Sequence, residues 1–158
     1  MARSHLKRKL EGEVEITEVA GDVMHALFSK RPHHIPAVIS EGFIHGCEVV
    51  QGAFGYSGST IKWTYSIDGN TKTVTQIFDV IEGKNKGMDF ICKDGDLTKD
   101  YENFVVSYRV IQVGHGSSKV VWKFEYEKKH SGFPEPTGEM DAFINITKDI
   151  NDHHHAIR

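Results

Sequence analysis

The sequence has few cysteines and no long apolar run, and each absence excludes a class of protein. Its two cysteines, Cys47 and Cys92, have no paired spacing, and thiols usually stay reduced in the cytosol, so we expect no disulfide framework. No apolar segment approaches the roughly 20 residues of a membrane-spanning helix. Residues 1–9 are basic but lack the apolar segment of a signal peptide, which favours a cytoplasmic location.

The chain also lacks a strong excess of either charge. It has 19 Lys and Arg against 22 Asp and Glu, a formal net charge of -3 at pH 7, and its cationic residues are scattered. A nucleic-acid-binding surface usually needs a basic patch or stripe, so we expect no nucleic-acid partner. No linker-like stretch divides the 158 residues, which predicts one domain spanning 1–158. We expect that domain to be a monomer or a weak dimer.

Motifs for metal binding, phosphate binding and covalent catalysis are missing as well. Three of the ten histidines form the run 153–155, but consecutive residues of a helix point in different directions and cannot all ligate one ion. The glycine-rich segment 52–59 enters a strand and lacks the lysine of a phosphate-binding loop. No Ser-His-Asp, Cys-His or paired-carboxylate arrangement can be read from the spacing. The sequence therefore predicts no metal and no cofactor, and it carries no enzyme signature.

The longest periodic segment is 136–155, which predicts a major helix. Its stripe of three- and four-residue spacings consists of Met140, Ala142, Phe143, Ile146, Thr147, Ile150 and His154. Thr137 can cap the helix, and Glu139 and Asp141 place negative charge in the first turn, where the helix dipole favours it. Lys148 and Asp152 should face water. A stripe of this length needs a broad surface to pack on.

Most of the remaining chain alternates between apolar and polar residues, as half-buried strands do. Seven strands are expected, within 10–16, 47–51, 61–67, 72–81, 88–93, 104–111 and 120–126. Tight-turn residues such as Asp68-Gly69 and Asp94-Gly95-Asp96 separate the last six, so these strands should form antiparallel hairpins.

Two short helices should lie between the first and second strands. The first is expected over 23–28 with Asp22 as its N-cap. The second is expected over 31–40, broken at Pro32 and Pro36.

One face of the expected strands gathers most of the aromatic side chains. A dry core suits tyrosine and tryptophan poorly, because each hydroxyl or indole N–H needs a hydrogen-bond partner. These residues either fill a plain core or line a partly open pocket, and the collective pattern favours a pocket for an apolar molecule. The candidate ligand-binding residues, from this face and the C-terminal helix, are Ile61, Trp63, Tyr65, Met88, Phe90, Cys92, Phe104, Tyr108, Trp122, Phe124, Tyr126, Met140 and Phe143. The hydroxyls of Tyr65, Tyr108 and Tyr126 should set ligand selectivity.

Several runs resemble the major latex protein branch of the Bet v I and pathogenesis-related class 10 superfamily, and together they span nearly the whole chain. The matching runs are Leu10-Glu11-Gly12-Glu13-Val14-Glu15, Pro32-His33-His34-Ile35, Gly52-x-Phe54-Gly55-x-x-Gly58-Ser59, Trp63-x-Tyr65, Gly95-Asp96-Leu97, Tyr101-x-x-Phe104, Tyr126-Glu127-Lys128 and Asp149-Ile150. The chain departs from the family pattern at Phe54, where Trp is usual, and at Asp94, where Glu is usual.

The resemblance implies an α+β helix-grip fold, in which a seven-stranded antiparallel curved sheet surrounds a long C-terminal helix and two short helices lie between strands 1 and 2. It also implies an internal cavity for sterol-, terpenoid- or fatty-acid-like plant metabolites, held for carriage, storage or defence. His33 and His34 match a run near the cavity entrance, which they either line or cap.

The alternative that the resemblance leaves open is a pocket enzyme, a cofactor-free cyclase or isomerase acting on a terpenoid or alkaloid intermediate. Some enzymatic members use a lysine on the last strand. Val121 aligns with that position here, which makes this particular chemistry unexpected.

Overall fold

The computed structural model describes residues 6–39, 44–67 and 69–153 of the 158-residue chain. Within them the strands are β1 (Lys7–Ile16), β2 (Ile44–Gln51), β3 (Thr60–Ile67), β4 (Asn70–Ile81), β5 (Gly87–Gly95), β6 (Tyr101–Gly114) and β7 (Ser117–Lys128). The helices are α1 (Gly21–Lys30), the 3-10 helix η2 (Pro32–His34), α2 (Ile35–Val38), α3 (Leu97–Asp100) and α4 (Thr137–Asp152).

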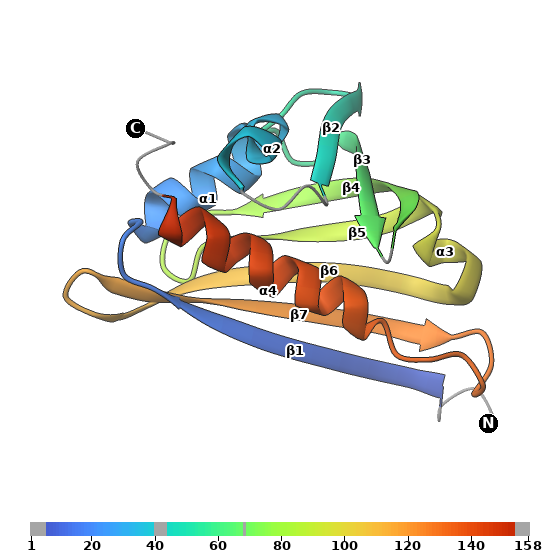
Figure 1. The fold of residues 1–158 in the computed structure, drawn as a ribbon. Helices are drawn as coiled ribbons and strands as arrows, with labels where there is room; N and C mark the ends of the chain where they lie inside the picture. The colour runs from blue at the N-terminus through green and yellow to red at the C-terminus, as the bar shows by residue number, and fades with distance from the viewer. Residues whose placement is uncertain (1–5, 40–43, 68, 154–158) are drawn as a thin grey trace.

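The seven strands form one antiparallel sheet in the order β1-β7-β6-β5-β4-β3-β2. Strands β2 to β6 each pair with the next strand along the chain, as expected for successive hairpins, and β1 pairs with β7. α4 lies across one face of the curved sheet, and α1 and α2 lie together near the end of the molecule where α4 ends (Figure 1). This arrangement confirms the predicted helix-grip fold.

Alternating side chains give the sheet one apolar face, as the sequence pattern predicted. In β1, Val14 and Ile16 are buried while the glutamates that alternate with them are exposed. In the β6–β7 hairpin, Tyr108 stands opposite Trp122 and both are fully buried. Pairs of large side chains opposite one another stabilise such a hairpin and supply the core beneath α4.

α4 confirms the predicted C-terminal helix and its two faces. Its buried residues are Met140, Ile146, Thr147, Ile150 and Asn151. Lys148 and Asp152 are exposed. The predicted cap at Thr137 is wrong, because Pro136 occupies the N-cap position and no side chain caps the helix. Residues 154 and 155 of the predicted helix lie outside the described residues.

Gly12 lies where α4 approaches the β1 side of the sheet. A Cβ added at Gly12 would lie only 2.9 Å from Cδ1 of Ile144, so that side chain would have to shift. Gly12 also stands opposite Trp122 on β7, whose indole lies under the same helix. α4 therefore packs directly against β1 and β7.

Two local predictions need correction, and one short helix was missed. Asp22 does not cap α1; Ala20 is the N-cap, and the Asp22 carboxylate lies 3.0 Å from Nζ of Lys86. Pro32 and Pro36 do not break one helix but stand in the first turns of η2 and α2, where a proline displaces no hydrogen bond. The helix α3 was not predicted, because its four residues are too few to show helical periodicity.

Candidate ligand-binding site

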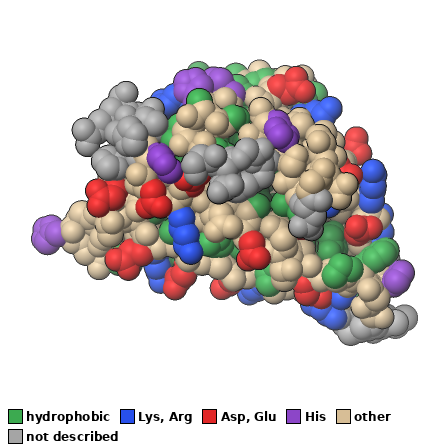
Figure 2. Space-filling view, viewed as in Figure 1, with side chains coloured by type: hydrophobic (Ala, Val, Ile, Leu, Met, Phe, Trp, Pro, Cys, Tyr) green, Lys and Arg blue, Asp and Glu red, His purple; other side chains and the backbone are tan. Residues whose placement is uncertain are grey.

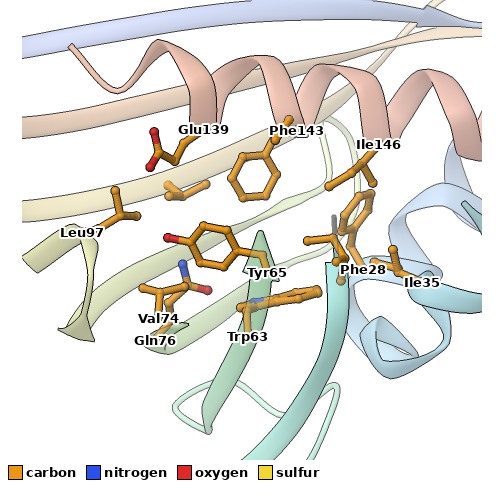
Figure 3. Close-up of a pocket in the computed structure, with 13 residues that line it drawn as sticks. Phe28, Ile35, Trp63, Tyr65, Val74, Gln76, Leu97, Glu139, Phe143 and Ile146 are labelled. Carbon is orange, nitrogen blue, oxygen red and sulfur yellow. The ribbon is translucent and has the colours of Figure 1, made fainter. Parts of the chain in front are cut away.

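A cavity lies between α4 and the part of the sheet formed by β2, β3 and β4 (Figure 3). The cavity volume, taken as the space open to the centre of a water-sized sphere, is about 40 Å³. This is room for roughly three water molecules. Its wall is predominantly apolar. The lining residues are Phe28, Ile35, Ile44, Trp63, Tyr65, Val74, Gln76, Leu97, Val106, Glu139, Ala142, Phe143 and Ile146.

Strand register explains how β3 and β4 furnish one wall. Trp63 stands opposite Val74 on the neighbouring strand, and Tyr65 follows two residues later on the same face of β3. From the other side, Phe143 and Ile146 project from α4 toward the sheet (Figure 3). α1, α2 and α3 each add one apolar side chain at the ends of the cavity.

Two polar atoms in this wall have no hydrogen-bond partner among the described residues. They are the hydroxyl of Tyr65 and Oε1 of Gln76, and the two residues are only 7% and 2% exposed. The Gln76 amide is held by its other end, since Nε2 donates to Sγ of Cys92 at 3.4 Å. Burial raises the pKa of Tyr65, and the nearby Glu139 and Asp96 carboxylates raise it further. Tyr65 is therefore a neutral hydrogen-bonding group.

Glu139 is the one charged residue among those that line the cavity within the described chain. It lies one turn before Phe143 on α4, and its side chain is largely buried. Its carboxylate lies 3.8 Å from Nζ of Lys72 on β4. The cavity thus has a negative group at the end where Leu97 also lies (Figure 3).

The opposite half of the interior, beneath α4 on β6 and β7, has its polar groups paired. Nε1 of Trp122 donates to Oγ1 of Thr147 at 2.8 Å, and Thr147 in turn donates to the Phe143 carbonyl. The Tyr126 hydroxyl donates to Glu135 at 2.5 Å. The Trp122 and Phe143 rings lie 4.5 Å apart, so packed aromatic side chains fill this region.

His25 on α1 links that core to the surface. Its Nδ1 lies 2.7 Å from the Tyr108 hydroxyl and its Nε2 lies 3.1 Å from Oε1 of Glu82. Burial lowers the pKa of His25, and the Glu82 carboxylate partly opposes that effect. A neutral imidazole fits both contacts, because Nε2–H can donate to the carboxylate while Nδ1 accepts from the tyrosine hydroxyl.

The predicted site residues divide between the cavity and the core. Trp63, Tyr65 and Phe143 line the cavity. The other ten are buried beside it but are not among its lining residues: Ile61, Met88, Phe90, Cys92, Phe104, Tyr108, Trp122, Phe124, Tyr126 and Met140. Of the three tyrosine hydroxyls expected to set selectivity, only that of Tyr65 is unpaired in the cavity wall.

Sequence reasoning missed two polar lining residues that had a detectable signal. Gln76 interrupts the inward-facing series Val74, Gln76 and Phe78 on β4, and a polar residue at an inward position is unusual. Glu139 lies four residues before Phe143, so it is on the same face of α4 as the apolar stripe. The sequence interpretation had left Glu139 out of that stripe because it is charged. The apolar lining residues from α1, α2 and α3 depend on tertiary packing and left no such signal.

Two positions singled out by the resemblance lie away from the cavity. Val121 alternates with the buried Val120 and Trp122, so it is on the outer face of β7. His33 stacks on the ring of Phe54 in the glycine-rich segment, with centroids 4.4 Å apart. His33 is therefore an anchor between η2 and that segment.

Across 6–39, 44–67 and 69–153, no three His, Cys, Asp or Glu side chains gather closely enough to hold a metal ion. None of the helices in that part of the chain is long and apolar enough to cross a membrane. On the face shown in Figure 2, the described side chains of both charges are intermixed.

Comparisons with known proteins agree with the fold. The sequence matches the pathogenesis-related protein Bet v 1 family over residues 5–156. MLP-like protein 31 of Arabidopsis thaliana is 34% identical over 151 residues, covering 95% of this chain and 87% of that protein. The crystal structure of ginseng major latex-like protein 151 from Panax ginseng has a TM-score of 0.87 and 35% identity, covering 94% of this chain and 98% of that one. The chain therefore belongs to the Bet v 1 family, with major latex-like proteins among its relatives.

Proposed function

We propose that this protein binds a hydrophobic small molecule in the cavity between α4 and strands β2 to β4, and that it carries or stores that molecule. The observation that supports the proposal most directly is an apolar cavity in the interior, bordered by the aromatic rings of Trp63, Tyr65 and Phe143. Ligand sites of this kind are mostly apolar with a few placed polar groups. The fold of the family is also known for hydrophobic ligand binding.

The size of the cavity limits what enters without rearrangement. A dry cavity of about 150 Å³ binds one benzene ring, so at about 40 Å³ this cavity must widen even for a single-ring ligand. Larger ligands occupy pockets of about 300–1,000 Å³, so they require one wall to move. We expect β2 to yield first, because it is an edge strand with mostly exposed side chains and its pairing with β3 has register shifts at two places.

The two tryptophans allow a test with an internal control. Trp122→Phe leaves Trp63, in the cavity wall, as the only tryptophan, whereas Trp63→Phe leaves Trp122, in the packed core. Terpenoid, steroid, alkaloid and fatty-acid compounds should change the emission of the first variant more than that of the second. Circular dichroism would confirm that both variants are folded.

Two outcomes would contradict the proposal. A folded Trp122→Phe variant that responds to no compound would exclude binding at this cavity, and a response confined to Trp63→Phe would place the ligand elsewhere. Mass spectrometry of the recovered compounds separates carriage from catalysis: unchanged compounds support carriage or storage, and an altered compound would identify a pocket enzyme.

A further inference from the structure

The two unpaired polar atoms of the cavity wall carry information about the ligand. In the described chain, the hydroxyl of Tyr65 and Oε1 of Gln76 are the buried side-chain atoms without a hydrogen-bond partner, and both residues line the same cavity. Buried polar groups in proteins are nearly always paired, so an unpaired group in a cavity wall indicates a partner supplied from outside the chain.

The Gln76 amide is oriented by one contact. Nε2 of Gln76 donates to Sγ of Cys92 at 3.4 Å, which leaves Oε1 as the free end of the amide. The Tyr65 hydroxyl and the Gln76 amide appear at the same end of the cavity as Leu97 in Figure 3. Both residues line this one cavity of about 40 Å³, which is the basis for assigning a single ligand group to both.

We propose that the ligand is a neutral apolar molecule bearing a hydroxyl group, and that Tyr65 and Gln76 hold this hydroxyl; the inference rests on the proposed function. A hydroxyl has one hydrogen to donate and two lone pairs to accept with. Its hydrogen suits Oε1 of Gln76, which can only accept. Its oxygen suits the phenolic O–H of Tyr65, which then donates. Both unpaired atoms are satisfied by one small group.

Charge separates this ligand from a fatty-acid anion. The Glu139 carboxylate lines the same cavity, so a carboxylate ligand would place a second negative group in a mostly apolar enclosure. A carboxylate also has no hydrogen to donate to Oε1 of Gln76. A protonated amine would be attracted by Glu139, but it has no lone pair to accept from the Tyr65 hydroxyl, and Glu139 already faces Lys72.

Four single-ring probes test this inference: toluene, benzyl alcohol, benzylamine and benzoate. Dissociation constants would be measured by NMR titration for the wild type, Tyr65→Phe and Gln76→Met. Benzyl alcohol should bind about tenfold more tightly than toluene, the gain expected from two buried hydrogen bonds. Each variant removes one of the two hydrogen bonds, so it should weaken the binding of benzyl alcohol about threefold and change the binding of toluene much less. Tyr56→Phe, at an exposed tyrosine, is the matched control and should change nothing.

The outcomes distinguish this inference from the function on which it depends. Equal binding of toluene and benzyl alcohol would overturn the hydroxyl subsite and leave hydrophobic binding intact. Tighter binding of benzylamine, lost in Glu139→Gln, would show that the site selects cations, and tighter binding of benzoate would show that it selects anions; either result overturns the inference. If none of the probes and none of the larger compounds bound, the proposed function itself would fail.

Discussion

The two halves of the interior under α4 differ in how their polar groups are satisfied. On the β6 and β7 side, the Trp122 indole and the Tyr108 hydroxyl each have a partner within 2.8 Å. On the β3 and β4 side, Tyr65 and Gln76 each leave an atom unpaired beside a cavity. Both halves are rich in aromatic residues, so composition does not separate them. The pairing of polar groups separates the two halves, because a packed core must pair its buried polar groups within the chain. A binding site can have polar groups whose partner is the ligand.

The difference has a packing origin. α4 comes close to β1 where Gly12 offers no side chain, and the Trp122 indole donates to Thr147 on the same helix. With the helix fixed on that side, the space toward β3 and β4 is bridged only by long side chains such as Phe143. The packed half therefore supplies rigidity and the open half supplies the site. Four predictions, from the largest expected effect to the smallest, test this contrast.

Truncating one tryptophan in each half should give the largest effect. Trp122→Ala should reduce the free energy of unfolding by about 3–5 kcal/mol, because the fully buried ring loses its packing and leaves Thr147 without its donor. Trp63→Ala should cost only about 2 kcal/mol, since that ring already borders a cavity. Urea denaturation measures both. Equal losses would show that the two halves are equally well packed.

Asn151 tests how the end of α4 is fixed. Its Oδ1 accepts from the backbone N–H groups of Thr17, Glu18 and Val19, at 2.9 to 3.2 Å, and so joins the helix to the segment after β1. Asn151→Ala should cost about 1–3 kcal/mol, because the buried Val19 N–H loses its partner. Asn145→Ala, at an exposed position of the same helix, is the control. A loss no greater than that of the control would argue against this anchor.

Removing a single hydroxyl should have opposite effects in the two halves. Tyr108→Phe leaves Nδ1 of His25 unpaired and should cost about 1–2 kcal/mol. Tyr65→Phe removes a buried hydroxyl that has no partner, so the ligand-free protein should keep its stability or gain up to about 1 kcal/mol. Thermal unfolding compares the two variants directly. A matching loss in Tyr65→Phe would mean that this hydroxyl has an internal partner after all.

Acidification should give the smallest effect, through His25 in the packed half. Burial lowers the pKa of His25 below its usual value of 6.5. As the pH falls below 6.5, His25 binds a proton in the unfolded chain more readily than in the folded protein. The free energy of unfolding therefore falls as the pH falls. His25→Asn should flatten the dependence of Tm between about pH 7.5 and about pH 5. His33, whose pKa is also lowered by burial, remains in both proteins as background, so identical slopes would exclude a role for His25.

Much of the fold could be predicted from local patterns. Alternation in the strands, turn residues between them and the long helical stripe each reflect contacts between residues close in sequence. The helix caps were predicted less well, since Asp22 pairs with Lys86 from a distant turn instead of capping α1. The family resemblance, carried by motifs along nearly the whole chain, agreed with the sheet order and with the comparisons.

The site was predicted only in part. The inward face of the strands was assigned correctly, but that face serves both the packed core and the cavity, and only Trp63 and Tyr65 among its named residues line the cavity. Which inward residues border open space depends on where α4 lies. The helix meets the sheet through contacts between residues far apart in the chain, such as Gly12 and Ile144, 132 positions apart. Sequence alone therefore determined the sheet, the helix and the side chains that point between them. Only the tertiary structure decided which of those side chains meet a hydrogen-bond partner and which, like Tyr65 and Gln76, have an atom without one. The reason is that a hydrogen bond depends on the distance between two groups, and local periodicity does not encode that distance.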